Sequence, residues 1–210
     1  MTCSTQPNRL AMRHRRTTFA LILLAALAAC TDPGDADPAA ETPAATEAEP
    51  AEGMEVQQAT VQFINLDGNP VGTGMVTETP SGIVINLDLH DMPPGARAIH
   101  IHSVGTCEDP EEGFVASGGH LNPDGREHGL MNPAGPDAGD LPNIVVRDDG
   151  TLQVELFTHL ASLHGADGRA TILDEDGAAL VIHENPDDHM TQPIGGAGPR
   201  IACGVIEPAG

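Results

Sequence analysis

The chain has 210 residues and a formal net charge of −22, and it contains no lysine, tryptophan or tyrosine. After residue 30, five arginines stand against 31 acidic residues, which leaves a formal charge of −26. A surface this acidic repels polyanions, which argues against nucleic acid as a partner and against electrostatic docking on anionic lipid.

The N-terminal end carries the features of a bacterial export signal. Arginines cluster between residues 13 and 16, and an apolar run follows from 19 to 29. That run is shorter than the roughly 20 residues that cross a bilayer as a helix. Small residues end it, as they do at a cleavage site. We therefore expect residues 1–29 to be a signal peptide and the mature chain to have no transmembrane helix.

The signal ends in Leu27-Ala-Ala-Cys30, which resembles the lipobox of bacterial lipoproteins. The resemblance implies that Cys30 is lipidated and becomes the first mature residue. Lipid would then hold the exported protein on the periplasmic side of the cell envelope. No aspartate directly follows Cys30, which favours the outer membrane. Two alternatives stay open: cleavage nearby with Cys30 as a plain thiol, and translation from Met12.

A biased segment follows the signal. Residues 31–52 contain only alanine, proline, threonine, glycine, aspartate and glutamate. No large apolar side chain there offsets the entropy lost on ordering, so we predict a disordered acidic tether over residues 30–53. From Met54 onward, β-branched residues return and polar and apolar positions alternate. One folded domain is expected over residues 54–210, which is long enough to bury a core.

Eight short runs rich in β-branched and apolar residues occur in this domain, with turn signals such as Asp67-Gly-Asn-Pro70 between them. The runs cover residues 60–66, 71–77, 83–89, 98–103, 144–147, 152–157, 178–183 and 200–206. This pattern predicts an all-β fold, an eight-stranded sandwich or barrel. The connections 104–142 and 184–199 are long and loaded with potential ligands, which favours a functional role for both.

Two closely spaced histidines, His100 and His102, are the strongest signal of a metal site. Positions two apart in a strand share one face, so both side chains can bind one ion while Ile101 enters the core. Further histidines follow at 120, 128 and 183 in polar, turn-forming surroundings. The pattern indicates a metal centre assembled by strands and loops.

The four cysteines have different expected fates. Cys3 leaves with the signal and Cys30 carries lipid, so Cys107 and Cys203 remain in the domain. In an exported protein such a pair is expected to form a disulfide. The alternative is two free thiols that bind metal, although neither has a cysteine or histidine neighbour at zinc-knuckle spacing.

Six motifs occur in order along the domain. They are Ala98-Ile-His-Ile-His102, Ser117-Gly-Gly-His-Leu-Asn-Pro123, Glu127-His-Gly129, Ala138-Gly-Asp-Leu-Pro142, Leu180-Val-Ile-His-Glu184 with Asp187-Asp188, and Gly198-Pro-Arg-Ile-Ala-Cys-Gly-Val205. The ordered set resembles the copper/zinc superoxide dismutases, in particular their exported bacterial lipoprotein branch, over residues 56–207. The resemblance implies an eight-stranded Greek-key β-barrel or sandwich, immunoglobulin-like, with two long functional loops.

The resemblance also implies the metal ligands. Copper is expected on four histidines, which are His100, His102, His120 and His183. His120 would be shared with zinc as a bridging imidazolate, and zinc would also take His128 and Asp140. Asp187 would accept hydrogen bonds from His100 and His128, which fixes the orientation of both rings.

One position departs from the family pattern. A third zinc histidine is expected directly before Ala138-Gly-Asp140, and this chain has Asp137 there. Zinc accepts carboxylate oxygen, so we expect a harder, more anionic zinc site that includes Asp137. Weaker zinc binding, partial occupancy or another ion are consequences left open. The alternative is that Asp137 only caps a turn beside Gly135 and Pro136.

Arg200 matches the active-site arginine of the family. The implied reaction is dismutation of superoxide to oxygen and hydrogen peroxide by a redox-cycling copper, with His120 as the proton carrier. Because superoxide is an anion and the mature chain is strongly acidic, only a local positive charge can guide it inward. Arg200 is expected to supply that charge, and the alternative is an ordinary surface salt bridge.

Two other functions are compatible with parts of this pattern. A non-enzymatic lipoprotein that buffers or delivers copper could use the same scaffold. A cupin also uses a His-x-His strand pair but needs a glutamate shortly after it, and Ser103-Val-Gly-Thr-Cys107 has none. His90, His159 and His164 are expected to be solvated, and His189 could line a channel. Whether the protein is a monomer or a homodimer is left open.

Overall fold

The computed structural model describes residues 56–210. The predicted signal peptide, Cys30 and the acidic tether fall before this part of the chain, as do the first residues of the predicted domain. Within it, none of the helices has the length and apolar character needed to cross a membrane.

The described part is built from short strands and three single 3₁₀ turns. The strands are β1 (Gln58–Asn65), β2 (Pro70–Thr79), β3 (Gly82–Leu89), β4 (Gly95–Arg97), β5 (Ile99–His102), β6 (Ile144–Val146), β7 (Leu152–Thr158), β8 (Ala161–Ser162), β9 (Ala170–Thr171), β10 (Ala179–His183) and β11 (Arg200–Pro208). The turns are η1 (Pro110–Glu112), η2 (Val115–Ser117) and η3 (Ala166–Gly168).

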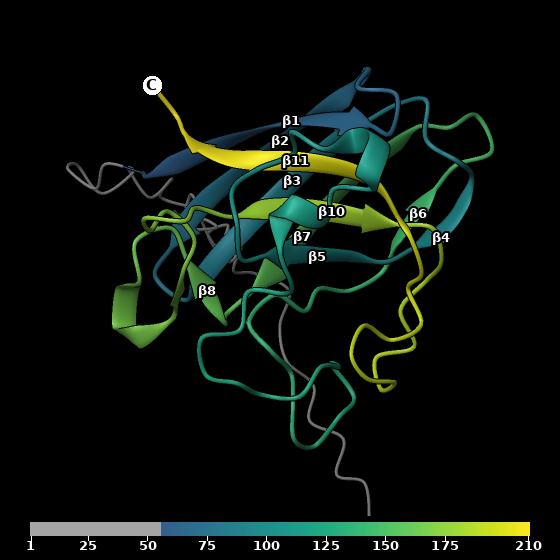
Figure 1. Cartoon of the computed structure of the whole chain (residues 1–210). Coiled ribbons are helices and arrows are strands. Elements are labelled where there is room, and N and C mark those ends of the chain that lie inside the picture. Colours follow the sequence, from purple (N-terminus) through teal and green to yellow (C-terminus); the bar gives the residue numbers. More distant parts are fainter. Residues whose placement is uncertain (1–55) are drawn as a thin grey trace, which may run out of the picture. The chain divides into compact units, whose positions relative to one another are not determined.

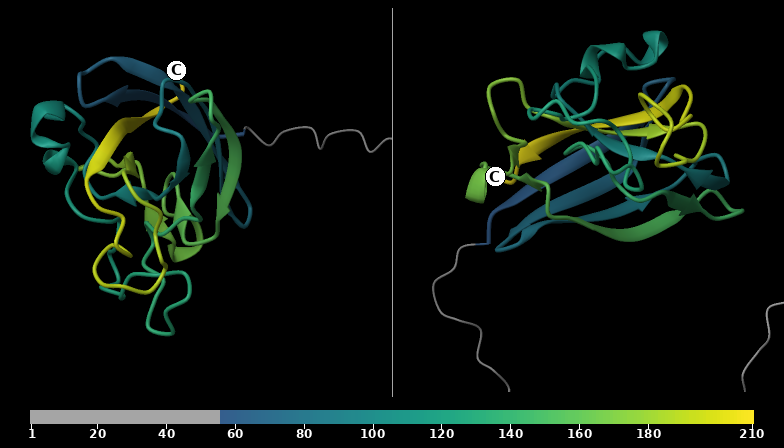
Figure 2. Two further views of the ribbon diagram at one scale, coloured as in Figure 1. Left: turned by 90° about the vertical axis from the view of Figure 1, so that its right-hand side faces the viewer. Right: turned by 90° about the horizontal axis from the view of Figure 1, so that it is seen from below.

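Seven strands form one curled antiparallel sheet in the order β5, β10, β11, β1, β2, β3, β7 (Figure 1). β6 pairs with β4, which directly precedes β5, and β6 is joined to β7 by a tight turn. The β6–β7 hairpin therefore lies between β3 and β4, which are consecutive in sequence, and this is a Greek-key arrangement. Figure 2 shows the strands curving around a common interior. The predicted Greek-key β fold is confirmed.

Alternating side chains fill the interior of this curled sheet. In β1, Ala59, Val61 and Phe63 are fully buried, while the side chains between them are more exposed. β10 is instead buried along its whole length. Its outer face packs in a second cluster with Cys107, Phe114 and Cys203. The loop after β5 therefore covers β10 and β11 from outside.

All eight predicted strands are present, and their limits differ from the prediction by a few residues. β5 falls within the predicted run 98–103, and the short strand β4 just before it was not predicted. Ala98 separates the two strands and donates its backbone N–H to the Asn185 carbonyl over 2.9 Å. The pair β8 and β9 and the three 3₁₀ turns were not predicted, since two- and three-residue pieces are too short to show a period.

Candidate metal centre

The open edge of β5 explains how distant residues meet. One edge pairs with β10, and on the other edge Ile101 bonds to two parts of the long loop, donating to Gly139 over 2.9 Å and accepting from Leu121 over 2.8 Å. These bonds place His120 and Asp140 beside the two strand histidines. A side chain at position 139 would bring its Cβ to 2.3 Å from the Ile101 carbonyl oxygen, so only glycine allows the approach.

Four histidines converge beside this edge, and they are His100, His102, His120 and His183. Their ring centroids lie 4.1 Å apart for His100 and His120, and 5.8 Å apart for His102 and His183. His183 joins them from the end of β10, where a bulge shifts the pairing with β11. Strands and a loop that are distant in sequence thus supply one cluster of imidazoles.

The four rings each leave one buried nitrogen without a hydrogen-bond partner among the described residues. These nitrogens are Nδ1 of His100 and Nε2 of His102, His120 and His183. The opposite nitrogens of His102 and His183 face the Gly118 and Gly198 carbonyl oxygens at 3.0 Å. A carbonyl accepts a hydrogen bond from the imidazole N–H, so the other ring nitrogen keeps its lone pair. Buried, unpartnered lone pairs are what a metal ion requires.

A second group shares His120 with the first. Nδ1 of His120 lies 3.0 Å from Asp137 Oδ2 and 3.5 Å from Asp140 Oδ1, and Nδ1 of His128 lies 2.5 Å from the same Asp140 oxygen. The donor atoms of the four residues all lie within 4.8 Å of one another. Two nitrogens and two carboxylates form a donor set that suits zinc.

Asp137 does two things in this group. Its Oδ1 accepts a hydrogen bond from the Gly139 N–H at 3.0 Å, which caps the turn, while its Oδ2 faces His120. Its own N–H donates to Asp140 Oδ2 at 3.0 Å, and its side chain is buried. Turn capping and a ligand position are therefore compatible.

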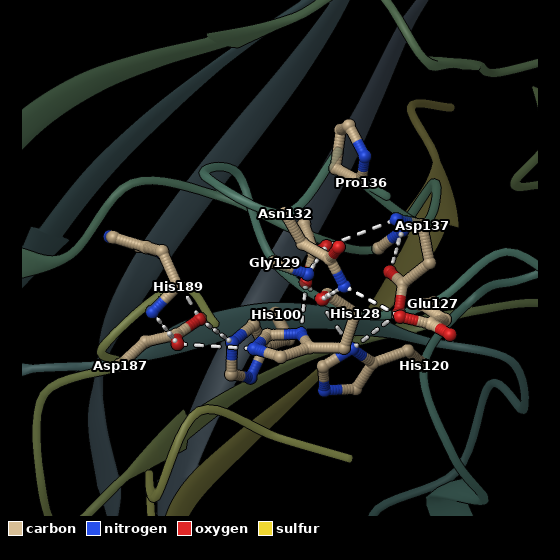
Figure 3. A network of polar contacts seen from close by, with 12 residues as sticks. His100, His120, Glu127, His128, Gly129, Asn132, Pro136, Asp137, Asp187 and His189 are labelled. Carbon is tan, nitrogen blue, oxygen red and sulfur yellow. Dashed lines mark hydrogen bonds and ion pairs between the residues drawn. The ribbon is translucent and has the colours of Figure 1, made fainter. Parts of the chain in front are cut away.

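Asp187 connects the two groups (Figure 3). Its Oδ2 lies 3.0 Å from Nε2 of His100, and its Oδ1 lies 3.1 Å from Nε2 of His128. The His189 N–H donates to Oδ1 at 2.6 Å. Gly195, with φ of +60°, has no side chain here because its Cβ would stand 1.5 Å from that oxygen. The carboxylate thus orients one ring of each group.

The electrostatics separate the two groups in the metal-free chain. Burial, helped by the charge of Arg200, lowers the pKa of His102 to about 2 and that of His183 to about 3. Burial also lowers the pKa of His100. For His128, burial acts the same way but is outweighed by hydrogen bonds with Asp140 and Asp187, which raise its pKa to about 10. His100, His102 and His183 are therefore neutral and ready to bind a cation.

Carboxylates dominate the second group. Hydrogen bonds with Asp137 and Asp140 outweigh the effect of burial on His120 and raise its pKa. The same kind of bonds hold the pKa values of Asp140 and Asp187 well below their usual range, although burial opposes this. A metal ion in this group must therefore displace protons from the imidazoles.

Arg200 lines a cleft of about 860 Å³ together with His102, His120 and His183. Its Nη1 donates to the Phe114 carbonyl, and its Nη2 donates to the Gly118 carbonyl at 2.6 Å. Burial lowers its pKa, but a guanidinium stays charged at any physiological pH. Glu111 and Glu112 also line the cleft, so Arg200 is a positive charge in acidic surroundings.

The disulfide between Cys107 and Cys203 is present, with the two Cα atoms 5.8 Å apart. It ties the long loop to β11, three residues from Arg200, as the sequence predicted. Sequence reasoning missed other supports of the site. The Arg126 guanidinium donates to the Gly135 and Pro136 carbonyls directly before Asp137.

Asn143 was also missed. The Asn143 side chain accepts a hydrogen bond from the Asp187 N–H and donates one to the Asp187 carbonyl, both at 2.8 Å. His189, expected as a possible channel residue, lies instead against Asp187, with Nδ1 3.3 Å from Oδ2. No motif reveals these contacts, because most of them involve backbone groups brought near by loop folding.

Comparison with known proteins gives a consistent picture. A family model described as copper/zinc superoxide dismutase matches residues 71–206. A Cu-Zn superoxide dismutase from Caulobacter vibrioides is 48% identical over 142 residues, which is 67% of this chain and 80% of that protein. Superoxide dismutase [Cu-Zn] 2 from Aquifex aeolicus is 43% identical over 150 residues, with 71% and 86% covered. The crystal structure of a SOD-like protein from Bacillus subtilis matches with a TM-score of 0.66 at 39% identity, covering 70% of this chain and 97% of its own.

Proposed function

The chain belongs to the copper/zinc superoxide dismutase family and is a superoxide dismutase that uses copper and zinc, and we propose which residues hold each metal and where the enzyme works. Copper is assigned to His100, His102, His120 and His183. The observation that carries this assignment is the set of four buried imidazole nitrogens without hydrogen-bond partners in residues 56–210. An all-nitrogen set suits copper, which imidazole binds well.

Zinc is assigned to His120, His128, Asp137 and Asp140, with His120 shared between the metals. Nδ1 of His128 and Oδ1 of Asp140 are buried and form a close ion pair at 2.5 Å in the metal-free chain. The donor atoms of all four residues lie within 4.8 Å of one another, so one ion could bind them after displacing the imidazole protons. Asp187 orients one ring of each group and binds neither metal.

The reaction consumes two superoxide anions and two protons and yields one O₂ and one H₂O₂. When bound, copper supplies the one-electron couple and zinc supplies a fixed positive charge beside the shared imidazole. Arg200 attracts the anion into the cleft and faces it with a cation that cannot be deprotonated. His120 can hold a proton at Nε2 and hand it to the reduced substrate, while its Nδ1 is kept in place on the carboxylate side.

We further propose that the enzyme acts on the periplasmic side of the cell envelope, anchored by lipid on Cys30. The basic and apolar start of the chain, the Leu-Ala-Ala-Cys ending and the acidic segment after it support this. The Cys30→Ser variant is expected to lose the acyl mass from its N-terminus and to leave the membrane fraction. A mature N-terminus at another residue would contradict the anchor.

Metal analysis of single variants tests the ligand assignment. The His183→Ala variant should lose bound copper and keep zinc, whereas His128→Ala should lose zinc and keep most copper. His164→Ala, an exposed histidine outside both groups, serves as the control and should keep both metals. Full copper content and an unchanged copper spectrum in His183→Ala would overturn the copper assignment.

A further inference from the structure

Ser117 occupies a position between the cleft arginine and the copper group. It ends η2 and is fully buried. Its Oγ lies 2.8 Å from the Phe114 carbonyl oxygen, 3.1 Å from Nη1 of Arg200 and 3.3 Å from Nδ1 of His102. No other side chain in residues 56–210 hydrogen-bonds both Arg200 and a histidine of the copper group.

The directions of these bonds follow from the donors available. A guanidinium can only donate, and the serine hydroxyl has one proton, which goes to the Phe114 carbonyl. The Ser117 oxygen therefore accepts from Arg200. It also shares the single Nδ1–H of His102 with the Gly118 carbonyl, which lies closer, at 3.0 Å against 3.3 Å. This tautomer leaves Nε2 of His102 free, and that is the atom without a partner. The hydroxyl thus serves both partners without conflict.

The arrangement matters because Arg200 has a competitor nearby. The carboxylate of Asp109 acts electrostatically on Arg200, and its buried Oδ1 makes no hydrogen bond within the described residues. If the guanidinium turned toward Asp109, the positive charge would be neutralised and moved away from the copper side of the cleft. The Gly118 carbonyl also accepts from both Arg200 and His102, but it is a backbone group. Ser117 supplies the side-chain contact between Arg200 and His102.

We propose that Ser117 is a positioning residue that holds the Arg200 guanidinium in register with the His102 ring, so that the cation faces the substrate path to copper. The inference rests on the proposed roles of Arg200 and His102. It assigns to Ser117 no contact with substrate or metal. Removing its hydroxyl should loosen the guanidinium, which keeps its bonds to the Phe114 and Gly118 carbonyls, while leaving every metal ligand in place.

Chemical labelling of arginine tests this arrangement directly. Phenylglyoxal modifies guanidinium groups, and peptide mass mapping of the metal-loaded protein gives the rate at each arginine. Arg200 in the Ser117→Ala variant should react about three to ten times faster than in the unchanged protein, as expected for the loss of one charge-assisted hydrogen bond. Arg97 and Arg147, which lie outside the cleft lining, serve as internal references.

Two further variants separate positioning from stability. Ser162→Ala removes an equally buried hydroxyl that bonds Glu78 instead of the metal centre, and it should leave Arg200 labelling unchanged. Ser117→Thr keeps the hydroxyl and should restore slow labelling. Fast labelling of Arg200 in Ser117→Thr, with metal content unchanged, would contradict the role of the hydroxyl even if Ser117→Ala does not fold.

A second measurement reports on the charge at copper. Azide is a small anion whose binding to copper(II) is followed by its absorption band, and its affinity should fall about three- to tenfold in Ser117→Ala with copper content unchanged. Arg200 labelling and azide affinity within twofold of the unchanged protein would overturn the inference. Superoxide removal by the unchanged protein tests the proposed function separately, because labelling reads the guanidinium whether or not superoxide is turned over.

Discussion

Asp137 gives the second ligand group two carboxylates beside two imidazoles, where the family pattern has a third histidine. Its Oδ2 stands 3.0 Å from Nδ1 of His120, and its other oxygen caps the turn at Gly139. Carboxylate oxygen is a harder donor than imidazole, and it favours ions such as manganese(II) relative to zinc. We therefore expect aspartate in place of histidine at position 137 to change metal selectivity more than it changes the fold.

Restoring the histidine should sharpen that selectivity. In the Asp137→His variant we expect the affinity for zinc relative to manganese(II) to rise about tenfold or more, because a third imidazole replaces an oxygen donor. Competition with a chromophoric chelator measures both affinities. Asp124→His, an exposed change in the same loop, is the control. An unchanged or lower ratio in Asp137→His would show that Asp137 is not a ligand.

The proposed ligands could be named from sequence because spaced histidines and ordered motifs indicate chemistry directly. The residues that support them could not. Ser117 and Asn143 act through a hydroxyl and an amide that meet backbone carbonyls and N–H groups from other segments. Such contacts exist only after the loops have closed, and no local pattern marks them.

At the scale of elements, the strands were predictable and the path of the long loop was not. Alternation in β1 and β3 follows from one face meeting the core. The loop 104–142 instead adds to the open edge of β5 and covers the outer face of β10. Neither contact has a sequence period, because the loop uses glycine, isolated bridges and single turns.

The disulfide should hold this loop in place. It closes a sequence separation of 96 residues between Cys107 and Cys203. In the Cys107→Ser, Cys203→Ser double variant, we expect the free energy of unfolding to fall by about 2–5 kcal/mol. Urea denaturation of the metal-loaded protein measures this, and the unchanged protein under reducing conditions provides the comparison. Equal urea midpoints for the oxidised protein and the double variant would refute the clamp.

At the scale of the whole molecule, the balance of buried histidines sets how stability depends on pH. In the metal-free chain, His100, His102 and His183 have lowered pKa values, so they stay neutral in the fold while the unfolded chain takes up protons below pH about 6.5. Stability must then fall as pH drops below that value, by up to about 1.4 kcal/mol per pH unit for each histidine.

For the second group of ligands, the dependence of stability on pH has the opposite sign. His120 and His128 have raised pKa values, so above pH about 6.5 the fold keeps protons that the unfolded chain releases. Stability must then fall as pH rises toward 10. Urea unfolding of the metal-free protein between pH 5 and 9 should therefore show a maximum near pH 6.5. A free energy of unfolding that climbs steadily from pH 7 to 9 would contradict the ion pairs with Asp140 and Asp187.

Because the overall charge is negative, attraction of superoxide depends on the charges close to the cleft. Residues 31–210 carry a formal charge of −26, which repels superoxide at long range. Arg200 lines the cleft beside His102, His120 and His183, and its guanidinium is held by the Phe114 and Gly118 carbonyls. Short-range attraction by this cation and the bound metals must overcome the repulsion.

The most direct test is the decay of superoxide after pulse radiolysis, with the protein loaded with copper and zinc and the rate normalised to bound copper. We predict decay approaching the diffusional range for the unchanged protein, and a loss of one to two orders of magnitude or more in Arg200→Glu, because the local focus changes sign. Arg147→Glu makes the same charge change at an exposed site outside the cleft lining and should have little effect. Decay no faster than in buffer, with copper demonstrably bound, would contradict the account and leave a metal carrier on the dismutase scaffold.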